Sequence, residues 1–181
     1  MKKDRLNLSR STRFVAFNGL LAALALALSA LEGMLPPIPV LPPGAKLGIS
    51  NLATMYAAGA VGLGPALCIA VIKGLFAGMT RGVTAMLMSL SGGVLSTLVM
   101  WLLLHKKGEP FGMVGLGVAG ALSHNAAQLC VAALLTTPAV AWYIPWLIVF
   151  GVVSGILTGL VLRAVMPFLD RLGPGNEGAG F

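Results

Sequence analysis

Long apolar runs, broken by short stretches of proline, glycine or charge, constrain this chain more than any other feature of its sequence. The first run, residues 14–35, supplies about 20 apolar residues, enough for a helix to cross ~30 Å of hydrocarbon at 1.5 Å per residue. The third is the weakest, because its 15 residues reach only ~22 Å and Lys73 interrupts them. The pattern predicts an all-α integral membrane protein, a six-transmembrane-helix bundle with spans at 14–35, 47–63, 65–79, 83–104, 112–136 and 143–166.

Few charged residues are available to cover a water-soluble surface. Only 17 of the 181 residues are charged (12 Lys and Arg with 5 Asp and Glu), whereas a soluble domain carries roughly 25%. The composition therefore excludes a water-soluble monomeric enzyme. The net charge of +7 lies at the ends of the apolar runs instead of forming a patch with aromatic residues. The lipid bilayer is therefore an expected partner, and nucleic acid is not.

Basic residues predict the orientation of the spans. With six spans and the N-terminus inside the cell, nine basic residues fall on the cytoplasmic side and only Lys46 and Arg81 fall outside. We expect a multi-pass protein of the cell (inner, cytoplasmic) membrane with both termini cytoplasmic. Its parts would be a basic leader at 1–13, one membrane domain at 14–168 and a disordered tail at 169–181. The first run exceeds the ~7–15 residues of a signal-peptide core, so we expect it to be retained.

Polar residues inside the runs gather at mid-depth or in the outer half of the predicted bundle. Four charged residues lie within or beside the runs and sum to +2, namely Glu32, Lys46, Lys73 and Arg81. Polar groups in hydrocarbon cost several kcal/mol unless they are paired, so the cluster predicts either an interhelical network or a ligand cavity. A cavity would bind a small polar or anionic solute through Lys46, Asn51, Arg81, Ser89, Ser91, His124, Asn125 and Gln128. The sequence gives no role to Lys73 or Glu32.

A proline-rich segment at 36–44 joins the first two runs. It holds five prolines in eight residues and cannot be helical. We expect it on the outer side, above the polar cluster, where it would act as a stiff lid or as a plain connector.

Small residues at helical spacing form two ridges. One consists of Gly19, Ala23 and Ala27 in the first run, and the other of Gly151, Gly155 and Gly159 in the last. Small residues let helix backbones approach closely in a membrane. The last-run ridge predicts internal packing. The first-run ridge fits internal packing or docking of another membrane protein equally well.

Catalytic and metal-binding motifs are absent from the sequence. There is no GxxxxGK[ST] phosphate loop, the five acids are scattered, and the two cysteines, Cys68 and Cys130, lie far apart within apolar runs. We therefore expect no catalytic residue, no metal and no cofactor bound by this chain, and we expect that it is not an enzyme.

Four features together resemble the Gx transporter family, whose members are often labelled heptaprenyl diphosphate synthase component I. They are the first-run ridge, the proline-rich loop followed by KLGISNL at 46–52, SLSGG at 89–93 and SHNAAQL at 123–129. Members look like substrate-binding S components of energy-coupling factor (ECF) transporters. The resemblance implies a six-helix bundle that captures a vitamin-like solute from outside. It also implies a transmembrane coupling subunit, docked at Ala23 and Ala27, and two cytoplasmic ATPases that use ATP.

The sequence thus predicts the substrate-binding membrane subunit of an ECF-type importer from the ATP-binding cassette (ABC) class. One alternative is a non-catalytic membrane accessory subunit of polyprenyl diphosphate synthesis, and another is a stand-alone secondary carrier. The identity of the solute does not follow from the sequence.

Overall fold

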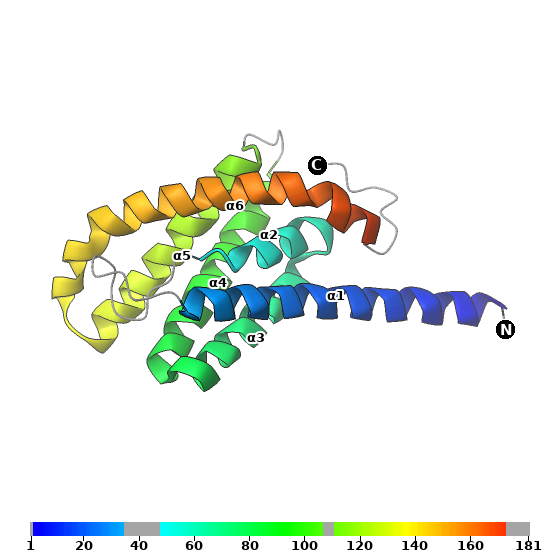
Figure 1. Cartoon of the computed structure of the whole chain (residues 1–181), viewed down its shortest axis with the longest axis horizontal. Helices are drawn as coiled ribbons and strands as arrows, with labels where there is room; N and C mark the ends of the chain where they lie inside the picture. Colours follow the sequence, from blue (N-terminus) through cyan, green and yellow to red (C-terminus); the bar gives the residue numbers. More distant parts are fainter. Residues whose placement is uncertain (1, 35–47, 107–110, 173–181) are drawn as a thin grey trace.

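The computed structural model of the chain describes residues 2–34, 48–106 and 111–172. Within these ranges the chain is helical and holds no strand, which confirms the all-α class (Figure 1). The elements are α1 (Lys2–Met34), α2 (Asn51–Ala60), α3 (Leu63–Arg81), α4 (Val83–Leu104), α5 (Met113–Leu135), the short 3₁₀ helix η1 (Pro138–Tyr143) and α6 (Ile144–Leu172).

Five of these helices are long and apolar enough to cross a membrane, and α2 is the exception. α2 has 10 residues and spans ~15 Å, about half of the hydrocarbon thickness. It lies between Gly48 (φ +82°) and Gly62 (φ +122°), whose positive φ values suit glycine and interrupt a helix. The expectation of a full second span at 47–63 is corrected to a half-length helix, because apolar composition does not reveal where glycine ends a helix.

The expected weak third span is a full-length helix. α3 has 19 residues and reaches ~28 Å. It begins two residues before Pro65, which therefore stands in the first turn, where its missing N–H costs no hydrogen bond. Gly82 (φ +91°) alone separates α3 from α4 and turns the chain back on itself.

The chain runs back and forth along the bundle, and α1 begins at the same end at which α6 finishes (Figure 1). We call this the terminal end, and the opposite end, where α1 finishes and α2 begins, the pocket end. α1 is ~50 Å long and its apolar portion starts only at Thr12, so its first turns project beyond the bundle (Figure 1). The start of α1 and the end of α6 therefore lie at the same end of the bundle.

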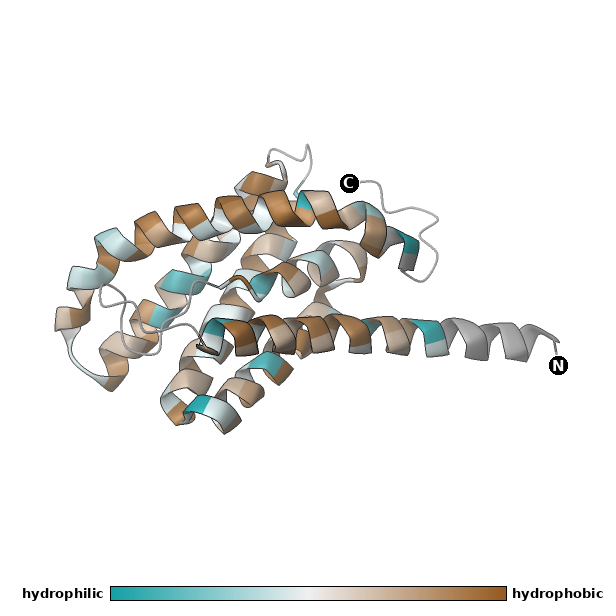
Figure 2. Ribbon diagram, viewed as in Figure 1, coloured by the Kyte–Doolittle hydropathy of each residue, from teal (hydrophilic) through white to brown (hydrophobic). Residues whose placement is uncertain are grey.

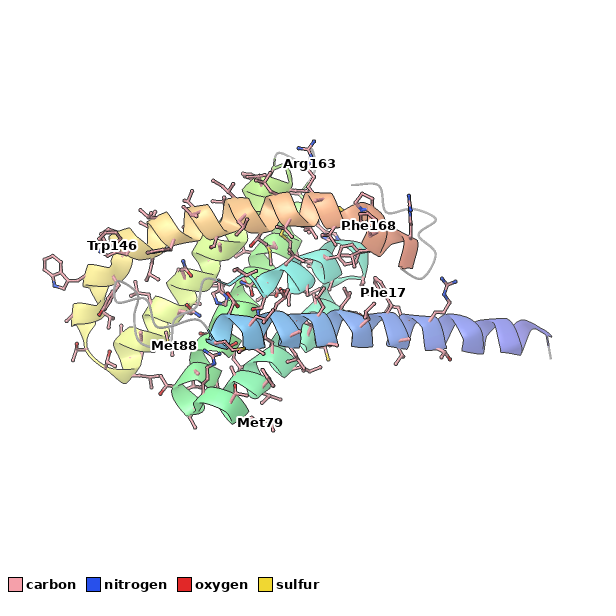
Figure 3. The ribbon with its side chains drawn as sticks, in the orientation of Figure 1. Phe17, Met79, Met88, Trp146, Arg163 and Phe168 are labelled. Atoms are coloured by element: carbon pink, nitrogen blue, oxygen red, sulfur yellow. The ribbon has the colours of Figure 1, made fainter. Side chains whose placement is uncertain are left out.

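Aromatic and basic residues mark the two ends. Trp142 in η1 is 84% exposed, and Trp146 stands at the start of α6 (Figure 3). Arg163 and Phe168 lie toward the other end of the same helix (Figure 3). Tryptophan and arginine at the ends of an apolar helix are typical of membrane interfaces, and apolar residues dominate the length of α6 between them (Figure 2).

The glycine ridge of α6 packs against α5. A Cβ atom at Gly155 would lie 2.5 Å from Val118 Cα, and one at Gly159 would lie 2.6 Å from Val114 Cα. These neighbours are backbone atoms and cannot move aside. The internal packing predicted for this ridge is confirmed, and it makes the contact between α5 and α6 the most extensive in the bundle.

The ridge of α1 faces away from the bundle. Phe17, Leu21 and Ala25 are buried on one side of α1, and Phe17 meets Tyr56 of α2 edge to face, with ring centroids 6.1 Å apart. The ridge residues, Gly19, Ala23 and Ala27, are exposed on another side. The ridge therefore does not pack internally.

Matched alanine substitutions test the difference between the two ridges. We expect Gly155→Ala to destabilise the protein by roughly 1–3 kcal/mol, because its methyl group would overlap the backbone of α5. Gly19→Ala meets no atom within 4 Å and should leave stability unchanged or slightly raised. Thermal unfolding in detergent measures both, and equal melting temperatures would contradict the packing of α6 on α5.

Cysteine labelling tests the orientation. Cys68 and Cys130 are both exposed, so they are first replaced by alanine. A cysteine in place of Lys106, at the terminal end, should react with an impermeant reagent only after cells are opened, whereas one in place of Val83, at the pocket end, should react in intact cells. The reverse pattern would put the termini outside.

Candidate functional site

A narrow polar pocket lies at the pocket end of the bundle. Five segments contribute to its lining: the last turns of α1, the turn before α2, α3, the start of α4, and α5. The lining residues are Ser29, Glu32, Gly48, Ser50, Lys73, Arg81, Ala85, Ser89, His124 and Gln128. The free space among them is enough for about one water molecule. The pocket is thus nearly filled by its own side chains.

Glu32 joins α1 to the start of α2. Its Oε1 accepts a hydrogen bond from the backbone N–H of Ile49 (2.7 Å), and its Oε2 accepts one from the N–H of Ser50 (3.4 Å). Ser50 is the residue that precedes the first turn of α2. The carboxylate therefore sits at the positive end of the α2 dipole, where a negative charge is favourable.

Lys73 joins α3 to α2. It is only 1% exposed, and its Nζ donates a hydrogen bond to Oδ1 of Asn51 (2.5 Å). A buried ammonium group is costly unless it has polar partners. The first residue of α2 is therefore held by a cation from the neighbouring helix, while Glu32 holds the residues just before it.

His124 and Gln128 form a hydrogen-bonded pair on one face of α5. Gln128 Nε2 lies 2.9 Å from His124 Nε2, and because an amide nitrogen only donates, the imidazole Nε2 accepts. The ring fits closely against α4, since a Cβ atom at Gly92 would lie 2.7 Å from His124 Nδ1. Gly92 is therefore the residue that makes room for this histidine.

Three buried polar atoms around the pocket have no hydrogen-bond partner within the described residues. They are Asn51 Nδ2, His124 Nδ1 and Gln128 Oε1, and each of these residues is at most 5% exposed. Buried polar atoms are normally paired, and those that are not call for an explanation such as a water molecule or a ligand.

The pocket carries a positive charge. Lys73 and Arg81 contribute two positive charges and Glu32 one negative charge, which leaves +1 with His124 neutral. Arg81, which is partly exposed, is attracted electrostatically by Glu32. Among the described residues, no three His, Cys, Asp or Glu side chains gather in a way that could hold a metal ion. The arrangement suits an anion or a ligand rich in hydrogen-bond acceptors.

The structure brings together five of the eight residues proposed from the sequence as a site. Arg81, Ser89, His124 and Gln128 line the pocket, and Asn51 is attached to it through Lys73.

Two other proposed residues, Asn125 and Ser91, lie away from the pocket lining. Asn125 faces α6, where its Nδ2 donates to the Leu147 carbonyl oxygen (2.8 Å), and Ser91 donates to the Met88 carbonyl oxygen of its own helix (3.1 Å). Lys46 and the proline-rich segment 36–44 lie outside the described residues.

Sequence reasoning did not assign Ser29, Glu32 and Lys73 to the site, although all three line it. A signal existed for two of them, because Ser29 and Glu32 stand three residues apart and therefore share a face of α1. Lys73 was recognisable only as a charge inside an apolar run.

A double-mutant cycle tests the contact between α3 and α2. Lys73→Met should leave the Asn51 oxygen without this donor, and Asn51→Leu should remove an acceptor from a buried ammonium group. We expect each change to destabilise the protein and the pair to show a coupling of about 1–3 kcal/mol in thermal unfolding. Additive effects would show that the contact contributes nothing.

Comparison with known proteins gives one match. The model of the family described as heptaprenyl diphosphate synthase component I matches residues 21–165, which is 145 of the 181 residues and includes parts of every helix from α1 to α6. No curated protein and no solved structure matches the chain.

Proposed function

Because the chain belongs to the heptaprenyl diphosphate synthase component I family, we propose that it is the membrane-embedded, non-catalytic subunit of a polyprenyl diphosphate synthase. The observation that carries the proposal is the family match over residues 21–165. The match favours the accessory subunit of polyprenyl diphosphate synthesis, which the sequence analysis gave as an alternative, over the importer subunit. The match bears out the resemblance to the family labelled heptaprenyl diphosphate synthase component I, though not its likeness to ECF S components. Component I is a non-catalytic subunit, so the chain is not an enzyme.

A membrane subunit suits the chemistry of this product. A polyprenyl chain is a long hydrocarbon, and each buried methylene group contributes about 0.8 kcal/mol to its partition into a bilayer. A synthase that makes such a chain in water must deliver it to lipid. A bundle of five membrane-crossing helices would hold the catalytic component at the bilayer surface, next to the phase that receives the product.

The description component I implies that another component of the synthase catalyses the reaction. The terminal end offers a surface for a water-soluble partner, because exposed basic residues lie there. Arg163 and Arg171 on α6 are exposed toward the same end. This basic surface would attract an acidic face of the catalytic component.

Capture of partners tests the proposal. A tagged chain, solubilised in mild detergent, should retain a soluble prenyl diphosphate synthase that mass spectrometry identifies. Membrane vesicles holding both should elongate labelled isopentenyl diphosphate faster than the soluble component alone. Reversing the charge at both Arg163 and Arg171 should weaken capture at least about tenfold, since each removes an attractive contact and adds a repulsive one.

The control for this experiment is Ala23→Leu on the exposed face of α1. It lies in the apolar part of the helix, away from a soluble partner, and should leave capture of the synthase unchanged. The proposal would be refuted if the captured material held no prenyl synthase and if neither the charge-reversal variant nor Ala23→Leu lost a partner.

The exposed ridge of α1 favours a second candidate function, solute import. Gly19, Ala23 and Ala27 are positioned to receive a helix of another membrane protein, such as a transmembrane coupling subunit driven by two cytoplasmic ATPases. The polar pocket at the opposite side of the membrane from the termini would then capture the solute. In the capture experiment this candidate predicts ABC-type ATPases in place of a prenyl synthase.

The same face of α1 gives a matched test of that candidate. Ala23→Leu and Ala27→Leu should abolish capture of a membrane partner without unfolding the protein, because both residues are exposed. Ala25→Leu on the buried face should instead lower the melting temperature, because Ala25 is 0% exposed. If the two exposed variants capture every partner that the unmodified chain captures, the ridge is not a docking surface.

A further inference from the structure

The start of α2 has the properties of an anion site. α2 begins at the pocket end with Ser50 and Asn51 buried, and the backbone N–H groups of Ile49 and Ser50 just before it donate to the carboxylate of Glu32. Helix N-termini bind phosphate and carboxylate groups through such N–H groups and through the helix dipole. In this structure the anion belongs to the protein itself.

Two cations stand around the same point. Lys73 is buried and donates to Asn51, the first residue of α2, and Arg81 is attracted by Glu32 across the pocket. A single carboxylate does not neutralise them, because the pocket keeps a charge of +1. Without Glu32 the charge would be +2, which matches a phosphate or diphosphate group better than it matches a neutral solute.

Unpaired polar atoms in and beside the pocket are a second, independent observation that points to a ligand. Gln128 is 2% exposed and lines the pocket, yet its Oε1 has no hydrogen-bond partner among the residues that the structure describes, and neither has the Nδ2 of Asn51, which is 5% exposed. Glu32 satisfies the backbone N–H groups but neither of these atoms. With Glu32 in place, the free space admits about one water molecule, so a larger ligand needs the carboxylate to leave.

We propose that Glu32 is an internal occupant of an oxyanion site at the start of α2, and that a phosphate or diphosphate group binds there by displacing it. The N–H groups of Ile49 and Ser50, together with Lys73 and Arg81, then hold the ligand's oxygens. Glu32 stands two residues before the end of α1, so a change of its side-chain rotamer frees the site without moving a helix. The choice of a diphosphate as ligand rests on the proposed function, and it requires a diphosphate that reaches the pocket end, opposite the end at which the soluble component docks.

Titration calorimetry on the purified full-length protein in detergent tests this inference. The probes are inorganic phosphate, inorganic diphosphate and geranyl diphosphate, so that binding of a free anion is distinguished from binding of a prenyl diphosphate. We expect inorganic diphosphate to bind Glu32→Gln at least about tenfold more tightly than the unmodified protein, because the variant keeps the side-chain shape and removes the competing charge. Arg81→Gln should weaken binding about tenfold.

Lys106→Gln is the matched control, since it also removes one positive charge but at the terminal end, and its affinity should equal that of the unmodified protein. Should Glu32→Gln fail to fold, Glu32→Asp serves in its place. Its shorter carboxylate reaches the N–H groups less well, so this variant protein should also bind diphosphate more tightly than the unmodified protein. Affinity in the Glu32 variants equal to or below that of the unmodified protein would overturn the inference, as would absence of binding by every form.

Failure of the inference and failure of the proposed function give different results. If the Glu32 variants gain no affinity but the chain still captures a prenyl diphosphate synthase, only the inference is wrong. If the variants gain affinity but no synthase is captured, the oxyanion site stands and the assignment to polyprenyl synthesis is wrong.

Discussion

The contact of the Glu32 carboxylate with the backbone before α2 is the interaction on which the interior of this protein depends. The residues at the start of α2 are buried, so the backbone N–H groups there need partners within the protein. Glu32 satisfies the two just before the helix, and Lys73 binds its first residue. α1, α2 and α3 are thereby joined around one point, and the same point becomes a polar pocket inside an otherwise apolar bundle.

Close backbone packing supports the other half of the molecule. α5 and α6 approach until Gly155 lies against the backbone of Val118, and this contact needs no polar group. Hydrogen bonds and charges therefore stabilise the part of the bundle around the pocket, whereas dispersion contacts stabilise the packing of α5 against α6. His124 links the two, because it belongs to α5 and lies against Gly92 of α4 at the pocket.

The two ends of the bundle offer different chemistry. The pocket end presents a cationic cavity with unpaired polar atoms, and the terminal end presents a projecting helix and exposed arginines. A subunit that holds a soluble synthase on one side and binds an oxyanion in its interior would use both. The exposed ridge of α1 lies between these ends and is the surface that another membrane helix would use.

The sequence by itself determined the all-helical class, the positions of the five long helices and the internal packing of the α6 ridge, because apolar length and small-residue spacing act locally along one helix. It also located Arg81, Ser89, His124 and Gln128 as polar residues in the right part of the chain. Only the tertiary structure decided that α2 is half-length, that Asn125 faces α6 while Gln128 faces the pocket, and that Glu32 occupies the start of α2. These depend on which faces of different helices meet, and that is set by close packing between residues far apart in sequence, which periodicity along one helix does not encode.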